Sequence, residues 1–107
     1  MSFKILPTIL FERELKRLSK KYPSIKLDLF ELTLSLKVNP GLGKALGNNC
    51  YKIRMAISYK NRGKSGGARV ITYVKIVDEV VYLLSIYDKS DTDTIEDNEL
   101  LNRIKDL

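Results

Sequence analysis

The sequence contains no histidine, no tryptophan and only one cysteine, Cys50, in 107 residues. Without histidine a Ser-His or Cys-His catalytic pair is impossible, and the usual nitrogen and sulfur ligands of zinc are almost absent. A single cysteine has no partner for an intramolecular disulfide, which favours a reducing compartment. Proton transfer in this chain would therefore have to come from side chains other than histidine.

Long apolar runs are missing as well. No segment approaches the roughly 20 apolar residues of a membrane-spanning helix. The first ten residues carry one lysine and an early proline, which is too short and interrupted for a signal peptide. Residues 1–107 fit one domain, with 44% hydrophobic and 30% charged residues. We expect a small, soluble, cytoplasmic protein.

Acidic residues are absent from the middle of the chain. Between Glu31 and Asp78, 46 residues contain no Asp or Glu and nine Lys or Arg, whereas residues 78–107 hold nine acids and three cations. Solvated surfaces normally mix both signs, so this segment should create a strong positive field over one region. The common cellular partner of such a field is nucleic acid.

The densest part of this segment is a glycine-rich loop. Lys60, Arg62 and Lys64 belong to this loop, and Arg69 lies just inside the strand that follows it. Glycines let a ligand approach the backbone, and cations can meet phosphate. The Gly-Lys-Ser run at 63–65 invites comparison with a nucleotide-binding P-loop, but Ser58 stands where that motif requires glycine, and a β-rich segment follows. We interpret the loop as anion-binding, with a solvated hairpin loop as the alternative.

Two helices are predicted in the first part of the chain, after a short strand at residues 3–6. Thr8 can cap the first helix, and Pro23 ends it. Residues 25–37 fit either a helical stripe or an alternating strand. Thirteen residues without glycine or proline favour the helix. The two helices would form an αα-hairpin.

Strand-like alternation dominates the rest of the chain. The predicted elements are a loop at 41–47, strands at 50–57, 69–77 and 80–87, a tight hairpin connection at 78–79 and a terminal helix at 98–107. The expected fold class is α+β. Two N-terminal helices would pack on one face of a small, mainly antiparallel sheet, and the other face would stay open.

Arg69 and the end of the third long strand are the best candidates for chemistry. An arginine fixed on a strand can present its planar fork to a phosphate. Tyr87 and Lys89 share one face, with Asp88 opposite, and a strand meander would bring them near Arg69. A tyrosine and a lysine could then transfer protons. The alternative for Tyr87 is half-buried packing.

Three sequence blocks together resemble the signature of HigB-type toxins, which belong to the RelE/ParE superfamily of type II toxin–antitoxin systems. The blocks are Lys52-Ile53-Arg54, then Gly63-Lys64-Ser65-Gly66-Gly67-Ala68-Arg69-Val70-Ile71, then Leu83-Leu84-Ser85-Ile86-Tyr87-Asp88-Lys89-Ser90. Their order and spacing match the family over about 40 residues. The helical pair with its Tyr-Pro break extends the resemblance to most of the chain.

The resemblance implies a RelE-like fold and a metal-independent, cofactor-free endoribonuclease that cuts mRNA on the ribosome. The substrate's own 2′-hydroxyl would attack the adjacent phosphorus. By the same resemblance, Arg69 matches the phosphate-binding arginine, and Tyr87 and Lys89 lie in the block that supplies catalytic groups. The RNA-binding residues would be Lys52, Arg54, Lys60, Arg62 and Lys64. The roles of base and acid stay open between the candidates.

The resemblance also implies partners: the ribosome, mRNA and a cognate antitoxin, commonly one with a DNA-binding helix-turn-helix. Two other functions fit the same superfamily. One is a ParE-like inhibitor of DNA gyrase, and the other is an RNA- or ribosome-binding domain without catalysis. The dense basic loop and the block around Tyr87 favour the nuclease.

Overall fold

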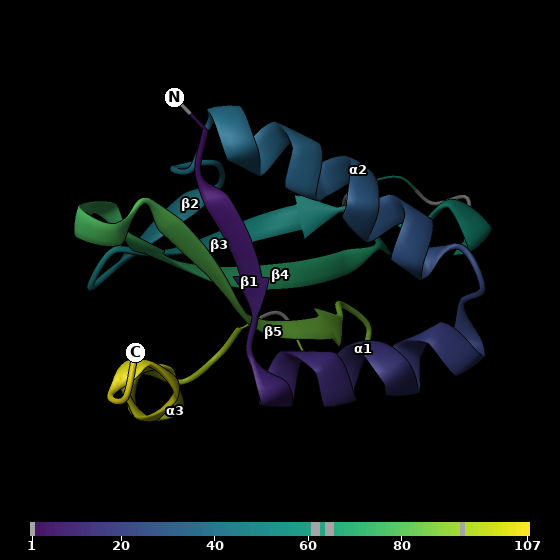
Figure 1. Ribbon diagram of the computed structural model, residues 1–107. Coiled ribbons are helices and arrows are strands. Elements are labelled where there is room, and N and C mark those ends of the chain that lie inside the picture. The colour runs from purple at the N-terminus through teal and green to yellow at the C-terminus, as the bar shows by residue number, and fades with distance from the viewer. Residues whose placement is uncertain (1, 61–62, 64–65, 93) are drawn as a thin grey trace.

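The computed structural model describes residues 2–60, 63, 66–92 and 94–107. These residues form three α-helices and a five-stranded mixed sheet (Figure 1). The helices are α1 (Ile9–Lys21), α2 (Ile25–Val38) and α3 (Asp97–Ile104). The strands are β1 (Lys4–Pro7), β2 (Lys44–Gly47), β3 (Cys50–Met55), β4 (Ala68–Lys75) and β5 (Val80–Asp88). The short 3₁₀ helices η1 (Ser58–Lys60) and η3 (Ile76–Asp78) connect them.

The sheet has the strand order β1-β5-β4-β3-β2. Strand β1 runs parallel to β5, and every other pair is antiparallel. The central strand β4 pairs along its length with β5, and from Ala68 to Tyr73 with β3. The expected fold class, α+β with helices on a mainly antiparallel sheet, is confirmed.

Local sequence explains how the two N-terminal helices begin and end. The Thr8 hydroxyl accepts a hydrogen bond from the Phe11 backbone N–H, which caps α1. The chain leaves α1 at Tyr22 before Pro23. Helix α2 confirms the helical interpretation of residues 25–37, with one more residue.

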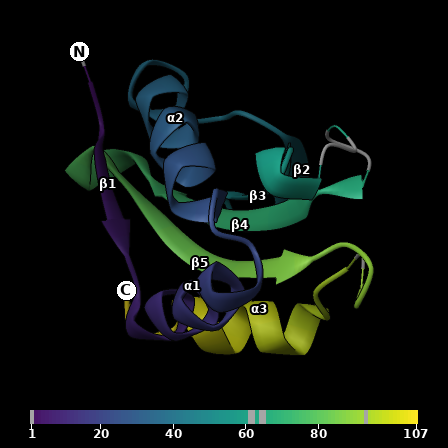
Figure 2. The ribbon, with the colours of Figure 1, turned by 90° about the vertical axis from the view of Figure 1, so that its right-hand side faces the viewer.

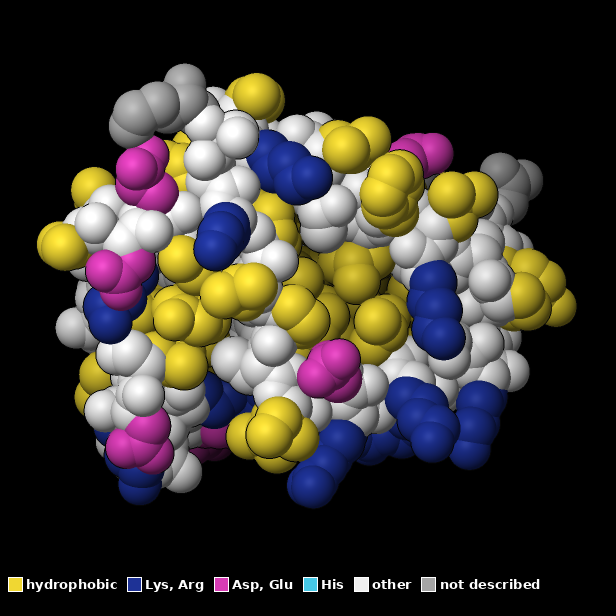
Figure 3. Space-filling model, in the orientation of Figure 1, with side chains coloured by type: hydrophobic (Ala, Val, Ile, Leu, Met, Phe, Trp, Pro, Cys, Tyr) yellow, Lys and Arg dark blue, Asp and Glu magenta, His cyan; other side chains and the backbone are white. Residues whose placement is uncertain are grey.

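Helix α2 is apolar on two faces. Ile25, Leu29 and Leu36 are buried against the sheet, as the helical stripe indicates. The solvent side of the same helix carries exposed apolar side chains: Leu27, Phe30, Leu34 and Val38. Apolar side chains gather along α2 in the space-filling view (Figure 3). This two-sided composition is the reason that periodicity alone left the segment ambiguous.

Side chains alternate between the two faces of the sheet. One face packs with α1 and α2 into the main core, which contains Phe11, Val70 and Ile86. The other face carries a smaller cluster, in which Leu100 of α3 packs on Ile71 and Leu84. Helices α2 and α3 therefore lie on opposite sides of the sheet (Figure 2). The expectation that the second face is open is wrong where α3 covers it.

Further features differ from the sequence prediction. Residues 44–47 of the expected loop form β2, a short edge strand. The strand expected to reach Ile57 ends at Met55. The connection at 78–79 is wider than a tight hairpin, because η3 precedes it and Glu79 adopts a left-handed conformation, with φ 54°.

An ionic cluster holds α3 against the rest of the molecule. The Arg103 guanidinium donates to both carboxylate oxygens of Glu14 on α1, at 3.1 and 3.0 Å, and to Glu99 on its own helix, at 2.8 Å. It also donates to the Leu84 carbonyl of β5. The side chains of Arg103 and Glu14 are only 11% and 20% exposed. One arginine thus ties α3 to α1 and to the sheet.

Arg103→Met is expected to lower the free energy of unfolding by about 3 kcal/mol, because it leaves a largely buried Glu14 carboxylate without its cation. Urea denaturation of both proteins would measure the difference. Lys105→Met, at an exposed site just after α3, is the matched control and should change stability by less than about 0.5 kcal/mol. Equal effects of the two substitutions would contradict a specific role for the cluster.

Candidate active site

Three candidate residues form one row across the sheet. Arg54 of β3 lies directly opposite Arg69 of β4, and Arg69 lies directly opposite Tyr87 of β5. Residues directly opposite each other in antiparallel strands project from the same face. The register therefore brings together three of the residues that sequence analysis selected, on the face that α3 only partly covers.

A second cationic pair lies on the same face. Lys52 of β3 is directly opposite Lys44 of β2, and it stands two residues before Arg54 on the same strand. Both like-charge pairs, Lys44 with Lys52 and Arg54 with Arg69, are opposed directly across a strand pair. Such pairs are mutually destabilising in a bare sheet. An anion bound between them would remove that repulsion.

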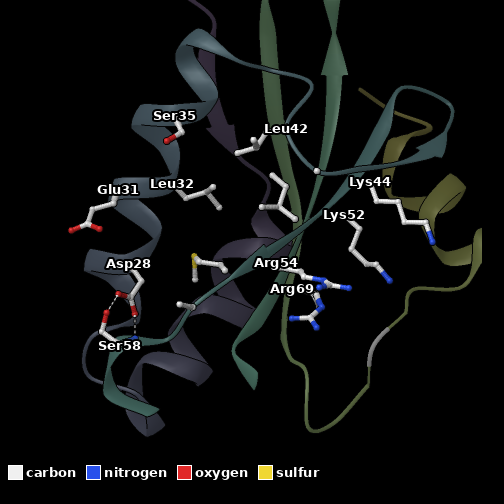
Figure 4. A pocket seen from close by; sticks show the side chains of 14 residues that line it. Asp28, Glu31, Leu32, Ser35, Leu42, Lys44, Lys52, Arg54, Ser58 and Arg69 are labelled. Atoms are coloured by element: carbon white, nitrogen blue, oxygen red, sulfur yellow. Dashed lines mark hydrogen bonds between the residues drawn. The ribbon is translucent and has the colours of Figure 1, made fainter. Parts of the chain in front are cut away.

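A groove of about 890 Å³ borders this face along β3. One wall is α2, with Asp28 and Glu31, and the opposite side carries Lys44, Lys52, Arg54 and Arg69 (Figure 4). The Asp28 carboxylate is already engaged in a structural contact, since it accepts hydrogen bonds from the Ser58 backbone N–H at 3.0 Å and the Ser58 hydroxyl at 2.6 Å. The cationic side is therefore the part of the groove suited to an anionic ligand.

Arg69 is held firmly at this position. Arg69 is only 3% exposed, and its Nη1 donates a hydrogen bond to the Ala68 carbonyl at 3.2 Å. The side chain still lines the groove. Arg54 is exposed, and Lys52 and Tyr87 are half-buried. The row thus combines one buried, fixed arginine with an exposed arginine at the surface.

Lys89 lies just beyond the end of β5. Its side chain is exposed, and its backbone N–H donates to the Gly67 carbonyl at 3.0 Å. This bond continues the β4–β5 pairing past Asp88 and keeps the turn close to the start of β4. Lys89 is therefore placed within the same end of the sheet as Arg69 and Tyr87.

Asp88 lies on the opposite face and is buried. Its carboxylate accepts hydrogen bonds from Lys60 Nζ at 2.8 Å, from the Ser90 backbone N–H at 3.0 Å, and from the Tyr22 hydroxyl. Burial alone would raise the pKa of Asp88, but the hydrogen bonds from Lys60, Tyr22 and Ser90 outweigh it and hold that pKa well below its usual range. Asp88 is a carboxylate fixed in its charged form.

Lys60 is the candidate whose position differs most from expectation. Its ammonium bonds Asp88 and the Gly66 carbonyl, the latter at 3.0 Å, and lies 5.2 Å from the centre of the Tyr22 ring. These contacts hold it on the helix side of the sheet, away from the cationic row. Its assignment to RNA binding stays a prediction. Arg62 and Lys64 lie outside the residues that the structure describes.

Within the described part of the chain, no group of three or more Cys, Asp or Glu residues could hold a metal ion. None of the helices there has the length and apolar character that crossing a membrane requires.

Residues 8–106 match the family model described as RelE toxin of the RelE/RelB toxin–antitoxin system. The chain belongs to the RelE toxin family. This confirms the RelE/ParE superfamily expected from the sequence blocks and makes the chain a RelE-like toxin of a toxin–antitoxin system. A search of curated proteins found no match.

Solved RelE toxins share the fold at low sequence identity. A double arginine-to-alanine mutant of E. coli RelE in the free state has a TM-score of 0.62 at 22% identity, over 86% of this chain and 88% of that one. The Mycobacterium tuberculosis RelBE2 toxin–antitoxin complex gives 0.63 at 19%, over 82% and 99%. The same E. coli mutant with an antitoxin RelBc peptide gives 0.59 at 19%, over 90% and 100%.

Three residues of this candidate site were not selected from the sequence. Lys44 was one cation among nine, inside an expected loop, and only the β2–β3 pairing places it beside Lys52. Asp88 carried a weak signal, since it is an acid that ends an otherwise uncharged strand. Gly67 belongs to the glycine run found in the sequence, but only the fold shows why a glycine is needed at this position.

Gly67 is required by a close backbone approach. A Cβ added there would lie 2.1 Å from the Met55 carbonyl oxygen, whereas a Cβ on Gly63 would meet nothing within 4 Å. Gly67→Ala should therefore lower the free energy of unfolding by at least about 2 kcal/mol through overpacking. Gly63→Ala, strained only by its positive φ, should cost about 1 kcal/mol. Denaturant titrations of both variants test this order, and the reverse order would contradict it.

The depressed pKa of Asp88 predicts a pH dependence of stability. A carboxylate with a lowered folded pKa stabilises the fold above its unfolded pKa of about 3.9 and loses that contribution as the pH falls below it. The asparagine of an Asp88→Asn variant does not titrate. The gap in unfolding free energy between the wild type and this variant should therefore narrow as the pH falls from about 5 to about 2, measured by urea denaturation. A gap that stays constant would contradict the prediction.

Proposed function

We propose that this RelE-family toxin is a ribosome-dependent mRNA endonuclease of the HigB type. The observation that carries the proposal is the row formed by Arg54, Arg69 and Tyr87, in which the two arginines lie directly opposite each other and Tyr87 lies directly opposite Arg69. Two positive charges held that close favour a ligand with concentrated negative charge, and the phosphate of RNA is such a ligand.

The proposed reaction needs no group beyond the chain and its substrate. The 2′-hydroxyl of the RNA attacks the adjacent phosphorus, and the bond from phosphorus to the 5′-oxygen of the next nucleotide breaks. The products are a 2′,3′-cyclic phosphate and a 5′-hydroxyl. One proton leaves the 2′-hydroxyl and one reaches the departing 5′-oxygen, so a base and an acid are required. Negative charge grows on the phosphoryl oxygens in the transition state.

The site offers a group for each requirement. Arg69, buried and fixed, would bind the scissile phosphate and stabilise its developing charge. Tyr87, directly opposite Arg69, and Lys89, at the strand end, would exchange the two protons. Lys52 and Arg54, together with Lys44, would bind neighbouring phosphates along the groove. The ribosome would present the mRNA, which places the activity in the cytoplasm.

A cognate antitoxin is the proposed protein partner. Relatives with the same fold have been solved as a toxin–antitoxin complex and with an antitoxin peptide. An antitoxin with an acidic segment would suit the cationic face, because opposite charges speed association and select the partner. For this chain we further propose the helix-turn-helix type of antitoxin that the HigB resemblance implies.

Induced expression of the chain in a bacterium should produce cuts within the coding region of an abundant mRNA. Primer extension would map the cuts, and a matched culture with translation initiation blocked is the control. The cuts should vanish in the control, because the proposed substrate is mRNA on the ribosome. Growth arrest with intact mRNA would overturn the proposal that the chain is a nuclease. Gyrase-linked DNA breaks would then indicate the ParE-like activity.

Arg69→Gln should lower the cleavage rate at least about 100-fold, the usual effect of removing a donor that stabilises transition-state charge. Glutamine preserves much of the side-chain volume, and thermal unfolding would confirm that the variant is folded. Lys37→Gln, at an exposed site at the end of α2, is the charge-matched control and should cleave like the wild type. A folded Arg69→Gln toxin with full activity would show that Arg69 has no part in the cleavage reaction.

A further inference from the structure

Asp88 lies between the two residues to which the proposed reaction assigns proton transfer. Tyr87 precedes it and Lys89 follows it, yet the Asp88 carboxylate projects to the other face of the sheet and the residue is only 1% exposed. In this position the carboxylate cannot touch an RNA held on the cationic face. Because the carboxylate is buried among hydrogen-bond donors, its role is to hold other parts of the chain in place.

The carboxylate joins three separate parts of the chain. Tyr22 comes from the end of α1, Lys60 from η1, and Ser90 from the turn that follows β5. All three donate to the same two oxygens. The backbone carbonyl of Asp88 also accepts from the Asp91 backbone N–H at 3.0 Å, so the residue closes its own turn. Both the side chain and the backbone of Asp88 are therefore fixed.

The opposite side of the turn is fixed as well. Asp88 is in register with Ala68, and the Lys89 backbone N–H bonds the Gly67 carbonyl. Gly67 in turn packs so closely on the Met55 carbonyl that it has no room to move toward β3. A rotation of the backbone at Asp88 would shift Tyr87 and Lys89 together, relative to an Arg69 that stays in place.

We propose that Asp88 is a positioning residue, which holds Tyr87 and Lys89 in the geometry that proton transfer at the Arg69-bound phosphate requires. This role rests on the proposed nuclease function. Misplacement of a reacting group by about 1 Å can cost about 100-fold in rate, whereas binding of RNA phosphates by Lys52 and Arg54 does not depend on the β5 turn. The role therefore predicts a loss in the chemical step and little change in binding.

The test compares single-turnover cleavage of an mRNA in the A site of purified ribosomes by wild-type toxin and by Asp88→Asn, Tyr22→Phe and Asp91→Asn. Asparagine presents an amide to the Lys60 ammonium and cannot keep all three bonds. Tyr22→Phe removes one donor and leaves the carboxylate intact, so it serves if Asp88→Asn is too unstable. Asp91, exposed in the same turn, is the charge-matched control. Thermal unfolding gives the folded fraction of each variant at the assay temperature.

Asp88→Asn, corrected for its folded fraction, should cleave at least about 30-fold more slowly at saturating toxin, and Tyr22→Phe about 3- to 10-fold more slowly. The half-saturating toxin concentration should change less than about twofold in both, and Asp91→Asn should match the wild type. A purely structural Asp88 would lower the folded fraction without changing the corrected rate.

The outcomes separate the two proposals. Wild-type corrected rates in Asp88→Asn, or in Tyr22→Phe if only that variant folds, would overturn the positioning role and leave the nuclease intact. A raised half-saturating concentration with an unchanged maximal rate would also overturn it, since the defect would then lie in binding. A wild-type toxin that cuts no ribosome-bound mRNA would overturn the nuclease and the positioning role together.

Discussion

The pairing of β4 with β3 and β5 is the constraint on which both the core and the candidate site depend. Side chains alternate between faces with a period of two, so one register decides which residues meet the helices and which meet solvent. In the observed register Val70 and Ile86 enter the core, while Arg69 and Tyr87 face the opposite side. A slip of one residue would push Arg69 toward the apolar core under α1 and α2. The hydrophobic core therefore enforces the geometry of the cationic row.

The same constraint explains why the sheet tolerates two like-charge pairs. Directly opposed cations cost a few tenths to about 1 kcal/mol for each pair. That cost is small beside the burial of the apolar face, so the repulsion is not relieved by moving the strands. The paired cations therefore keep a positive potential at a fixed place on the sheet. A phosphate that binds there relieves the repulsion, and the protein does not have to reorganise. Glu99 of the acidic C-terminal segment contributes instead to structure, through its contact with Arg103.

The sequence predicts those features that depend on local pattern and leaves open those that depend on distant partners. Alternation located β3, β4 and β5 to within two residues, and the expected meander, which would bring Tyr87 near Arg69, agrees with the observed register. Strand β2 was missed because a four-residue edge strand among glycines is defined by its pairing with β3 and has almost no pattern of its own. The docking of α3 depends on Arg103 meeting Glu14, 89 positions away in the chain. The charge of Lys60 is visible in the sequence, whereas its partner Asp88, 28 positions later, is visible only in the fold.

A site without histidine has to divide among several residues what one imidazole does alone. An imidazole changes charge near neutral pH and is stiff enough to aim its proton. Tyrosine and lysine titrate far from neutral pH, and lysine is flexible, so their usefulness depends on how well the backbone places them. The end of β5 bears on this need, because Tyr87 and the buried carboxylate of Asp88 project to opposite faces of the sheet and Lys89 follows directly after the strand. One of the bonds that fix this carboxylate comes from Tyr22, which is itself part of the main core. Under the proposed mechanism, the rigidity of the fold thus supplies the placement that the residue types themselves lack.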